Sequence, residues 1–216
     1  DRVMGGSLRG SPGEGFAAAH GFRVTAAFVI QEIDVHAGAW RAALAPPPDG
    51  FALVHWSGRT PDALIGSFVD ARLAFEDRPE QELSYQESPW TVERVRQEEE
   101  RLRESDVERR VTVAVDTATG AVAGLTAVEL PAHEPDRAAQ KETAVLARYR
   151  GHGLGLCMKA AMLASIAADR PAVQVIQTGT ALSNGHMIAV NHRLGYTDSF
   201  TSLGLEQSLT ALLDRL

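Results

Sequence analysis

Tyr149-Arg150-Gly151-His152-Gly153-Leu154-Gly155 is the stretch around which the chain can be interpreted. It follows a short apolar run, Thr143-Ala144-Val145-Leu146-Ala147, which predicts a strand because the run is brief, partly β-branched and abruptly ended. It leads into residues 156–169, where apolar side chains recur at the spacing of a helix; Met158, Met162 and Ile166 continue a row that begins at Leu154. The sequence therefore predicts a strand, a glycine-rich turn and a helix in succession.

A glycine-rich turn between a strand and a helix is typical of an anion site. The alternate glycines Gly151, Gly153 and Gly155 allow backbone N–H groups to point at a ligand. The first turn of the following helix adds unpaired donors and the positive end of the helix dipole. Arg150 and, when protonated, His152 would add positive charge at the rim. We therefore expect this turn to hold a diphosphate group.

Other motifs that would explain such a turn are absent. The chain has neither the dinucleotide spacing Gly-x-Gly-x-x-Gly nor the Gly-Lys-Ser/Thr of a P-loop. It has no Gly-x-Ser-x-Gly, so a serine hydrolase is not indicated. No histidine pair at helical spacing carries a glutamate, and we expect no metal. A plain tight turn without a ligand remains the alternative.

Two ordered motifs resemble the GNAT acetyltransferase superfamily. Arg150-x-x-Gly153-x-Gly155 after the strand resembles the acyl-CoA motif of that family. Asn184-x-x-Met187-x-x-x-Asn191-x-x-Leu194-Gly195-Tyr196 resembles its last helix. The resemblance covers roughly residues 51–216 and extends to tandem GNAT proteins. It implies an α/β fold, in which a mixed, mostly antiparallel sheet is splayed between two central strands and flanked by helices.

The resemblance also implies a site for acetyl-CoA. The backbone after the strand would hold the pantetheine arm, the glycine-rich turn the diphosphate, and the last helix the rest of the arm. The cofactor-binding residues carried over are Val145, Leu146, Ala147, Arg150, Gly151, His152, Gly153, Leu154, Gly155, Asn184 and Asn191. The N–H of Val145, where the family has a bulge, would polarise the thioester carbonyl.

The acid and base of the transfer are less clearly marked. Glu142, at the start of the predicted strand, is the best carboxylate to act as base; a surface glutamate is the alternative. Position 139, close to where the family often has its carboxylate, is alanine. Asn191 stands where many members have a tyrosine near the sulfur. An amide can donate a hydrogen bond to the thiolate but cannot deliver a proton; a contact on the helix surface is the other alternative.

Two functions follow from this resemblance. The first is an N-acetyltransferase that moves the acetyl group of acetyl-CoA directly to a primary amine. The second is a non-catalytic, regulatory acyl-CoA-binding domain, which the asparagine at position 191 and the uncertain base favour. The acceptor stays open, although a negative chain suits a cationic amine.

The composition narrows the class of protein. At 216 residues and 44% hydrophobic content, the chain can bury one good-sized core. The net charge of −7 argues against a nucleic-acid partner, and no apolar run is long enough to span a membrane. No signal peptide is visible, and the single cysteine, Cys157, excludes an internal disulfide and suits the cytoplasm. A buried, inert thiol is the preferred interpretation of Cys157.

The first part of the chain is a separate segment in this interpretation. We predict a loop at residues 4–12, a helix at residues 13–20 ended by Gly21, and a strand at residues 22–35. The run Phe16-Ala17-Ala18-Ala19-His20-Gly21-Phe22 is similar to Val190-Asn191-His192-Arg193-Leu194-Gly195-Tyr196. Residues 1–45 are therefore either a remnant of a first GNAT-like domain or an ordinary helix and strand. A remnant strand could pair with a second copy in a homodimer.

The proline-rich residues 46–50 form a linker, and residues 51–216 form the GNAT domain. The further predicted strands are 51–56, the hairpin 111–115 and 121–130, 173–178 and 200–205. The further predicted helices are one that begins at Thr60-Pro61, then 91–105, 184–194 and a short one in 208–216. Polar connections are expected at 77–90 and 131–140.

Overall fold

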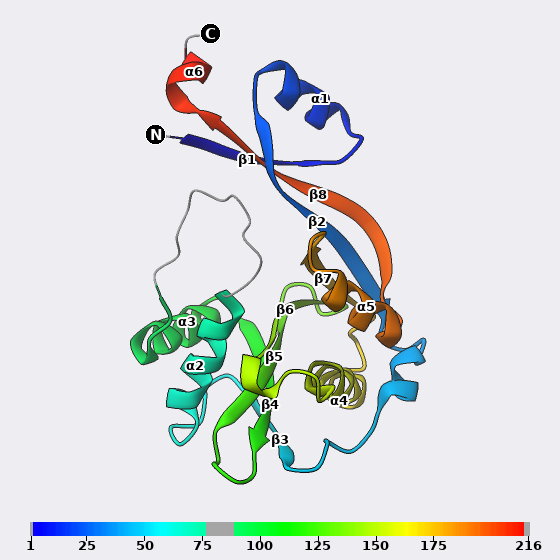
Figure 1. Cartoon of the computed structure of the whole chain (residues 1–216). Coiled ribbons are helices and arrows are strands. Elements are labelled where there is room, and N and C mark those ends of the chain that lie inside the picture. The colour runs from blue at the N-terminus through cyan, green and yellow to red at the C-terminus, as the bar shows by residue number, and fades with distance from the viewer. Residues whose placement is uncertain (1, 77–88, 214–216) are drawn as a thin grey trace.

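An eight-stranded sheet organises the computed structural model, which describes residues 2–76 and 89–213 (Figure 1). The strand order is β1-β8-β2-β7-β6-β5-β4-β3. The strands are β1 (Arg2–Leu8), β2 (Arg23–Asp34), β3 (Phe51–Ser57), β4 (Val107–Asp116), β5 (Val122–Pro131), β6 (Arg137–Val145), β7 (Val175–Ala181) and β8 (Thr197–Ser208). Every neighbouring pair is antiparallel except β6 and β7. The expected α/β fold with a mixed, mostly antiparallel sheet is confirmed.

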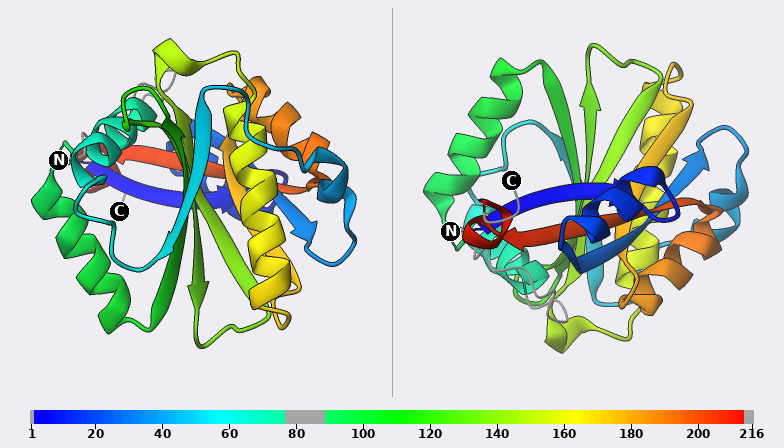
Figure 2. Two further views of the ribbon diagram at one scale, coloured as in Figure 1. Left: turned by 90° about the horizontal axis from the view of Figure 1, so that it is seen from below. Right: turned by 90° about the horizontal axis from the view of Figure 1, so that it is seen from above.

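Helices cover both faces of the sheet. They are α1 (Pro12–Ala19), α2 (Ile65–Glu76), α3 (Val92–Glu104), α4 (Leu154–Asp169), α5 (Gly185–Leu194) and α6 (Leu209–Leu213), with short 3-10 turns η1 (Ala39–Ala43) and η2 (Ala147–Tyr149). Figure 2 shows the α2–α3 pair and the α4–α5 pair on opposite sides of the central strands. Buried apolar side chains form a separate core under each pair. None of these helices has the length and apolar character of a membrane span.

The sheet splays apart between β6 and β7, as expected for this fold. The two strands pair only where Arg137, Ala138 and Ala139 face Val175, Ile176 and Gln177. Beyond these residues β6 follows β5, while β7 follows β2, and the two strands separate (Figure 1). The gap between them leaves one edge of each strand without a strand partner among the described residues. Such an edge can accept an extended ligand in place of a strand.

Local sequence signals predicted most of the helices and strands after residue 51. Thr91 caps α3 by accepting a hydrogen bond from the N–H of Arg94 at 3.1 Å, and Gly195 ends α5 at φ +98°. The predicted start of a helix at Thr60-Pro61 is wrong. The N–H groups of Leu64 and Ile65 both bond to the carbonyl of Pro61, which forms a turn, and α2 begins at Ile65. The predicted connection 77–90 lies largely outside the described residues.

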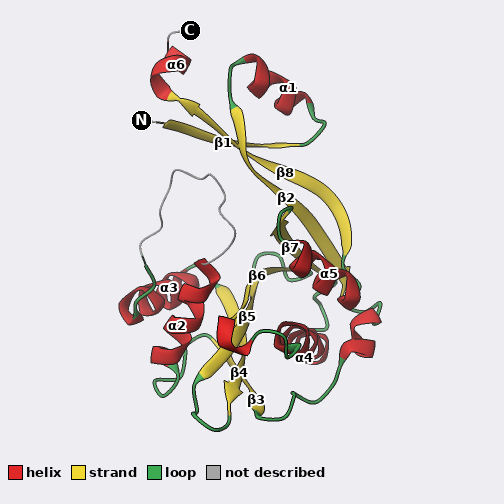
Figure 3. Ribbon diagram, viewed as in Figure 1, coloured by secondary structure: helices red, strands yellow, loops and turns green. Residues whose placement is uncertain are grey.

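The first strand is the clearest difference from the prediction. Residues 4–12 were expected to be a loop, but Arg2–Leu8 forms β1. Its glycine-rich sequence has little strand propensity. Its strand conformation comes from pairing along its whole length with Ser202–Ser208 of β8, some 200 positions later in the chain. Figure 3 shows β2 and β8 running together out of the helical part, with β1 and α1 at their far end.

Residues 2–45 share the sheet and the core with the rest of the described chain. Strand β2 lies between β7 and β8, and Trp40 is buried in the core under α4 and α5. The end of this segment lies against α4, because the thiol of Cys157 is 3.8 Å from the carbonyl oxygen of Ala45. The two parts of the chain are therefore one folded body. Their assignment to two GNAT units stays a prediction.

Candidate functional site

The open edge of β6 presents backbone donors to the gap. The N–H of Leu146 donates to the carbonyl of Ala123 on β5 at 3.0 Å. In an antiparallel pair the residues alternate between those that bond to the partner strand and those that face away from it. Val145 lies opposite Gly124, next to this bonded pair, so its N–H faces away from β5. Thr143, two residues earlier, has the same orientation, and both N–H groups are directed toward the gap.

The predicted strand ends earlier than expected. Residues 143–147 were assigned to a strand, but β6 runs from Arg137 to Val145 and Ala147 begins η2. The carbonyl of Ala147 accepts the N–H of Arg150 at 3.2 Å, so Ala147 belongs to the turn rather than to the free edge. The bulge expected at Val145 is also displaced. Between the pairs Thr126–Thr143 and Val128–Gln140, β6 has one extra residue, which places the bulge at residues 141–142.

The glycine-rich turn forms the predicted approach to a helix. Gly151 and Gly153 have φ values of +85° and +74°, which residues other than glycine rarely adopt, and Gly153 caps α4. A Cβ atom built on either glycine would meet nothing within 4 Å, so the turn has room beside its backbone. The first N–H groups of α4, from Leu154 onward, are the unpaired donors of a helix start. The turn therefore has the space and the donors that an anion needs.

Neighbouring side chains hold the turn in place. The hydroxyl of Tyr149 donates to Asp116 at 2.8 Å and lowers the pKa of that carboxyl, and its ring packs edge-on against Phe51. Arg150 folds back so that its Nε donates to the carbonyl of Val145 at 3.1 Å. The ring of His152 lies by Phe51, and its Nδ1 is 3.1 Å from the carbonyl oxygen of Arg150. Arg150 thus lies at the edge of the gap, and His152 supports the turn.

Glu142 lies in the middle of β6, not at its start, and it is buried. It is 5% exposed and faces α2 and α3, on the side of the sheet opposite α4. Arg72 of α2 approaches Glu142 Oε1 at 2.8 Å and Oε2 at 3.1 Å, and Arg109 of β4 also pairs with Oε1. Both carboxylate oxygens are therefore engaged, and the alternative of a surface glutamate is wrong.

Further charges complete this buried cluster. Glu98 of α3 pairs with Arg72 and lies 3.1 Å from Arg109. Burial would raise the pKa of Glu98, but the two arginines outweigh burial and lower it. Burial lowers the pKa of Arg109. The guanidinium of Arg72 also stacks on Trp90, 3.3 Å from the ring centroid. Glu129 of β5 adds a third carboxylate, 3.4 Å from Arg109, so the two arginines are paired with three glutamates.

Asn184 and Asn191 both lie on α5, in different settings. Asn184 caps the helix by accepting the N–H of Met187 at 3.1 Å. Asn191 has no exposed surface, so the alternative of a surface contact is wrong. Its amide nitrogen donates to Gln31 at 2.7 Å and to Thr180 at 3.2 Å. Since both amide hydrogens are used, the side chain in this arrangement has no hydrogen left for a sulfur atom.

Sequence patterns did not identify three of these residues. Gln31, Arg72 and Arg109 are buried polar residues that come from β2, α2 and β4. The sequence around each of them contains no recognisable motif. Their partners come from distant parts of the chain and are brought close only by the fold. The one available signal was a charged or amide side chain within a strand or an apolar stripe, which by itself does not indicate a partner.

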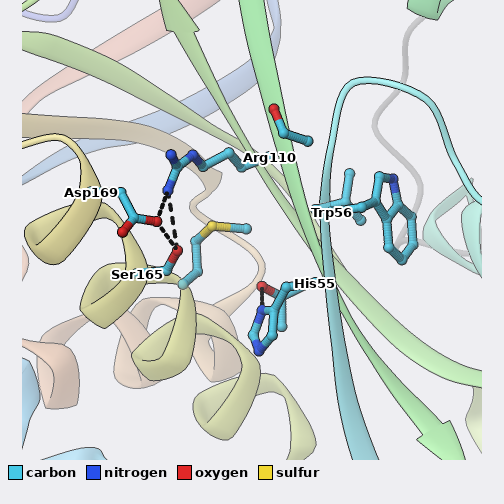
Figure 4. Close-up of a pocket in the computed structure, with 9 residues that line it drawn as sticks. His55, Trp56, Arg110, Ser165 and Asp169 are labelled. Carbon is cyan, nitrogen blue, oxygen red and sulfur yellow. Dashed lines mark hydrogen bonds and ion pairs between the residues drawn. The ribbon is translucent and has the colours of Figure 1, made fainter.

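A pocket lies near the end of α4 that is farther from the glycine-rich turn (Figure 4). It has a volume of about 200 Å³ and is lined by His55, Trp56, Ser57, Arg110, Val111, Thr112, Met162, Ser165 and Asp169. Arg110 donates to Ser165 at 3.1 Å and to Asp169 at 3.0 Å. Ser165 lies roughly 18 Å along the helix from Gly153, at 1.5 Å per residue. This pocket is therefore separate from the glycine-rich turn.

The metal-ligating side chains and the cysteine thiol in the described part of the chain do not form a further site. Within residues 2–76 and 89–213, no cluster of three or more His, Cys, Asp or Glu side chains has the arrangement of a metal site. Cys157 is buried, and burial raises the pKa of its thiol, which makes it a poor nucleophile. The candidate site is thus the β6 edge together with the glycine-rich turn.

The structure is similar to those of several known proteins. A tandem GNAT protein from the clavulanic acid biosynthesis pathway aligns over 95% of this chain and 63% of its own, with 27% identity and a TM-score of 0.75. A GCN5-related N-acetyltransferase from Sphaerobacter thermophilus aligns over 95% and 59%, with 16% identity and a TM-score of 0.67. One from Kribbella flavida aligns over 98% and 70%, with 16% identity and a TM-score of 0.58.

The chain spans less than two thirds of the first two of these proteins. No protein-family model matches its sequence. No curated protein matches it either. The likeness therefore rests on structure, and at these identities the second and third proteins are informative about the fold alone.

Proposed function

From its GNAT fold and its likeness to a tandem GNAT protein, we propose that this chain is an N-acetyltransferase that uses acetyl-CoA and acetylates a primary amine. The observation that carries the proposal is the pair of backbone donors on the free edge of β6, at Thr143 and Val145, followed within about ten residues by the donors at the start of α4 after the glycine-rich turn. A pantetheine arm carries amide groups that can pair with a strand edge. A diphosphate suits a helix N-terminus.

The N–H of Val145 is the group we assign to the thioester carbonyl oxygen. A donor at that position stabilises the negative charge that develops when the amine attacks the carbonyl carbon. The new C–N bond forms, the C–S bond breaks, and the proton lost by the nitrogen balances the departing thiolate. Glu142 is the candidate base expected from the sequence, but its oxygens are engaged by Arg72 and Arg109. We therefore propose that water carries the proton instead.

Acetyl-CoA should raise the melting temperature of the protein. A ligand that binds only the folded state and is present at a hundred times its dissociation constant adds about 2.7 kcal/mol to the free energy of unfolding. Thermal unfolding with and without acetyl-CoA measures this, and adenosine alone is the control for non-specific effects. A melting temperature unchanged by acetyl-CoA would mean that the glycine-rich turn is only structural.

A non-catalytic acyl-CoA-binding domain is the second candidate, and two observations favour it. The oxygens of Glu142 are engaged by arginines, and the amide hydrogens of Asn191 are used within the core. Neither side chain in this arrangement offers a free acid or base to the thioester. Release of CoA thiol from acetyl-CoA, with and without a mixture of primary amines, separates the two functions. Transfer requires amine-dependent thiol release.

Replacing Glu142 with glutamine should lower stability by about 3 kcal/mol, since it leaves two buried arginines with too little negative charge. We expect binding of acetyl-CoA to persist. Chemical denaturation measures the stability, and Glu134→Gln, at an exposed carboxylate, is the matched control with little change. Unchanged stability together with a large loss of kcat would instead assign Glu142 the role of base.

We also propose that residues 1–45 correspond to the end of a first GNAT-like unit. The match to the tandem protein covers 95% of the chain, which is more than residues 51–216 could supply. Three further proposals concern the setting of the protein. The acceptor is a primary amine, two copies form a homodimer through the edge of β1, and the protein is cytoplasmic. The single buried cysteine supports the last of them, because it requires no oxidising compartment.

A further inference from the structure

The bulge of β6 shifts the alternation of the strand by one residue. Between Gln140 and Thr143, β6 has two residues where β5 has one. In a regular strand Gln140 and Glu142 would share a face, because side chains alternate. Here Gln140 follows Ala138 into the core under α4 and α5 and is 6% exposed, whereas Glu142 reaches Arg72 of α2 on the opposite face.

This shift decides which backbone groups of β6 face the gap. Before the bulge, Gln140 faces β7, because the hydroxyl of Thr178 donates to its carbonyl at 3.4 Å. After the bulge, Val145 faces the gap, and its carbonyl accepts from Arg150, while the N–H of Leu146 bonds to β5. Without the bulge, the alternation that starts at Gln140 would turn the N–H of Val145 toward β5.

The side-chain amide of Gln140 spans the bulge. Its Nε2 has three acceptors, the carbonyl of Ala127 at 2.8 Å, the hydroxyl of Thr126 at 3.0 Å and the carbonyl of Glu142 at 3.3 Å. Ala127 lies opposite the bulge, and Glu142 is one of its two residues. Thr126 Oγ1 in turn lies 2.8 Å from Thr143 Oγ1, in the first pair beyond the bulge. The amide therefore links β5 and β6 where a bulge interrupts the backbone ladder.

The position of Gln140 is otherwise unfavourable for an amide. Val128, which lies opposite it, belongs to the apolar core under α4 and α5. A buried amide is costly unless it is hydrogen-bonded, and backbone carbonyls in an interrupted ladder need donors. Gln140 also follows directly on Ala139 and Gln177, the last pair that joins β6 to β7. One side chain thus holds the bulge at the point where the gap begins.

We infer that Gln140 is a positioning residue of the acyl-CoA site. Its amide holds the bulge at residues 141–142, and the bulge turns the N–H groups of Thr143 and Val145 toward the ligand. The inference rests on the proposed function, which assigns these donors to the acyl-CoA arm and the thioester carbonyl. Gln140 acts through the backbone of β6 rather than by contact with the ligand.

Gln140→Met tests the inference, because methionine keeps an unbranched side chain of similar length and removes the donor. Amide hydrogen exchange measured by NMR on the ligand-free protein reports the alternation of β6. In the wild type, the N–H of Leu146 should exchange more slowly than that of Val145, since only the former is bonded to β5. In the variant this difference should disappear or reverse. Isothermal titration should show a dissociation constant for acetyl-CoA raised roughly tenfold, because two backbone hydrogen bonds to the ligand are lost.

Deleting Lys141 from the Gln140→Met variant should restore the site. Without the extra residue, Glu142 lies opposite Ala127 and the ladder becomes regular, so no bulge has to be held. The N–H of Val145 then faces the gap again. We expect both the exchange difference and the affinity for acetyl-CoA to return toward those of the wild type. A variant that had only lost stability would not be corrected by the loss of a further residue.

Thr112→Val is the control for lost stability without a change in β6. Thr112 is fully buried on β4, two strands away from β6, and its hydroxyl lies 2.7 Å from Nδ1 of His55. This variant loses a buried hydrogen bond and should keep both the exchange difference and the affinity.

The outcomes separate the inference from the proposed function. An unchanged exchange difference in Gln140→Met overturns the inference, and so does a changed difference with unchanged affinity. If Gln140→Met does not fold, the deletion of Lys141 decides, because failure to restore folding and binding overturns the inference as well. Absence of acetyl-CoA binding by the wild type is a failure of the proposed function, and the exchange measurement still shows whether Gln140 holds the bulge.

Discussion

Replacing Gly153 with glutamate should abolish detectable binding of acetyl-CoA. Gly153 caps α4, and there is open space where its Cβ would lie. A carboxylate in this space would occupy the room expected for the diphosphate and would repel its charge. We expect the dissociation constant to rise on the order of a hundredfold or more, with charge repulsion and steric overlap acting together. Isothermal titration and the thermal shift with acetyl-CoA both measure it.

Gly58→Glu is the matched control for this variant. Gly58 has φ +70°, close to the +74° of Gly153, and it also has nothing within 4 Å of a built Cβ. It follows β3 at the end away from Phe51, which packs near the turn. The two variants therefore share the added charge and the backbone strain, and differ only in position. Normal binding by Gly153→Glu would remove the glycine-rich turn from the site.

Replacing Lys159 with methionine should stabilise the protein near neutral pH. Lys159 lies on α4, is 2% exposed and has its ammonium 5.0 Å from the ring centroid of Tyr196. Among the described residues it forms no ion pair, and burial lowers its pKa to about 7. The ordinary pKa of a lysine is 10.5. A drop to about 7 means that burial destabilises the charged form of Lys159 in the folded protein by roughly 5 kcal/mol at most. We expect a gain of about 3 kcal/mol at pH 6.5, because relaxation reduces such penalties.

The gain should disappear as the pH rises. Between pH 7 and about 10.5 the unfolded chain holds a proton on Lys159 that the folded chain lacks, so the stability of the wild type increases with pH across this window. Below pH 7 both states are protonated and the full penalty remains. Chemical denaturation at pH 6.5 and 10 measures the difference. Lys141→Met, at a half-exposed lysine, is the control and should show no such dependence; equal stability of Lys159→Met and wild type at pH 6.5 would refute the prediction.

Local patterns in the sequence determined the succession of elements. The strand, glycine-rich turn and helix around Gly153 were predicted from residues adjacent in the chain, as were the cap at Thr91 and the end of α5 at Gly195. These features depend on interactions within a few residues, such as caps, turn conformations and the periodicity of apolar side chains. The local structure of the candidate site could therefore be predicted before the fold was known.

Only the tertiary structure decided which polar groups lie inside and how they are paired. Asn191 and Gln31 are 160 positions apart, and Arg72 and Glu142 are 70 apart. Strand β1 likewise exists only through its pairing with β8. Side chains of the same kind can be solvated or buried, and long-range contacts that decide between these states leave no local pattern in the sequence. For that reason the sequence by itself predicted the strand, turn and helix of the candidate site, whereas the settings of Glu142 and Asn191 came from the packing of distant elements.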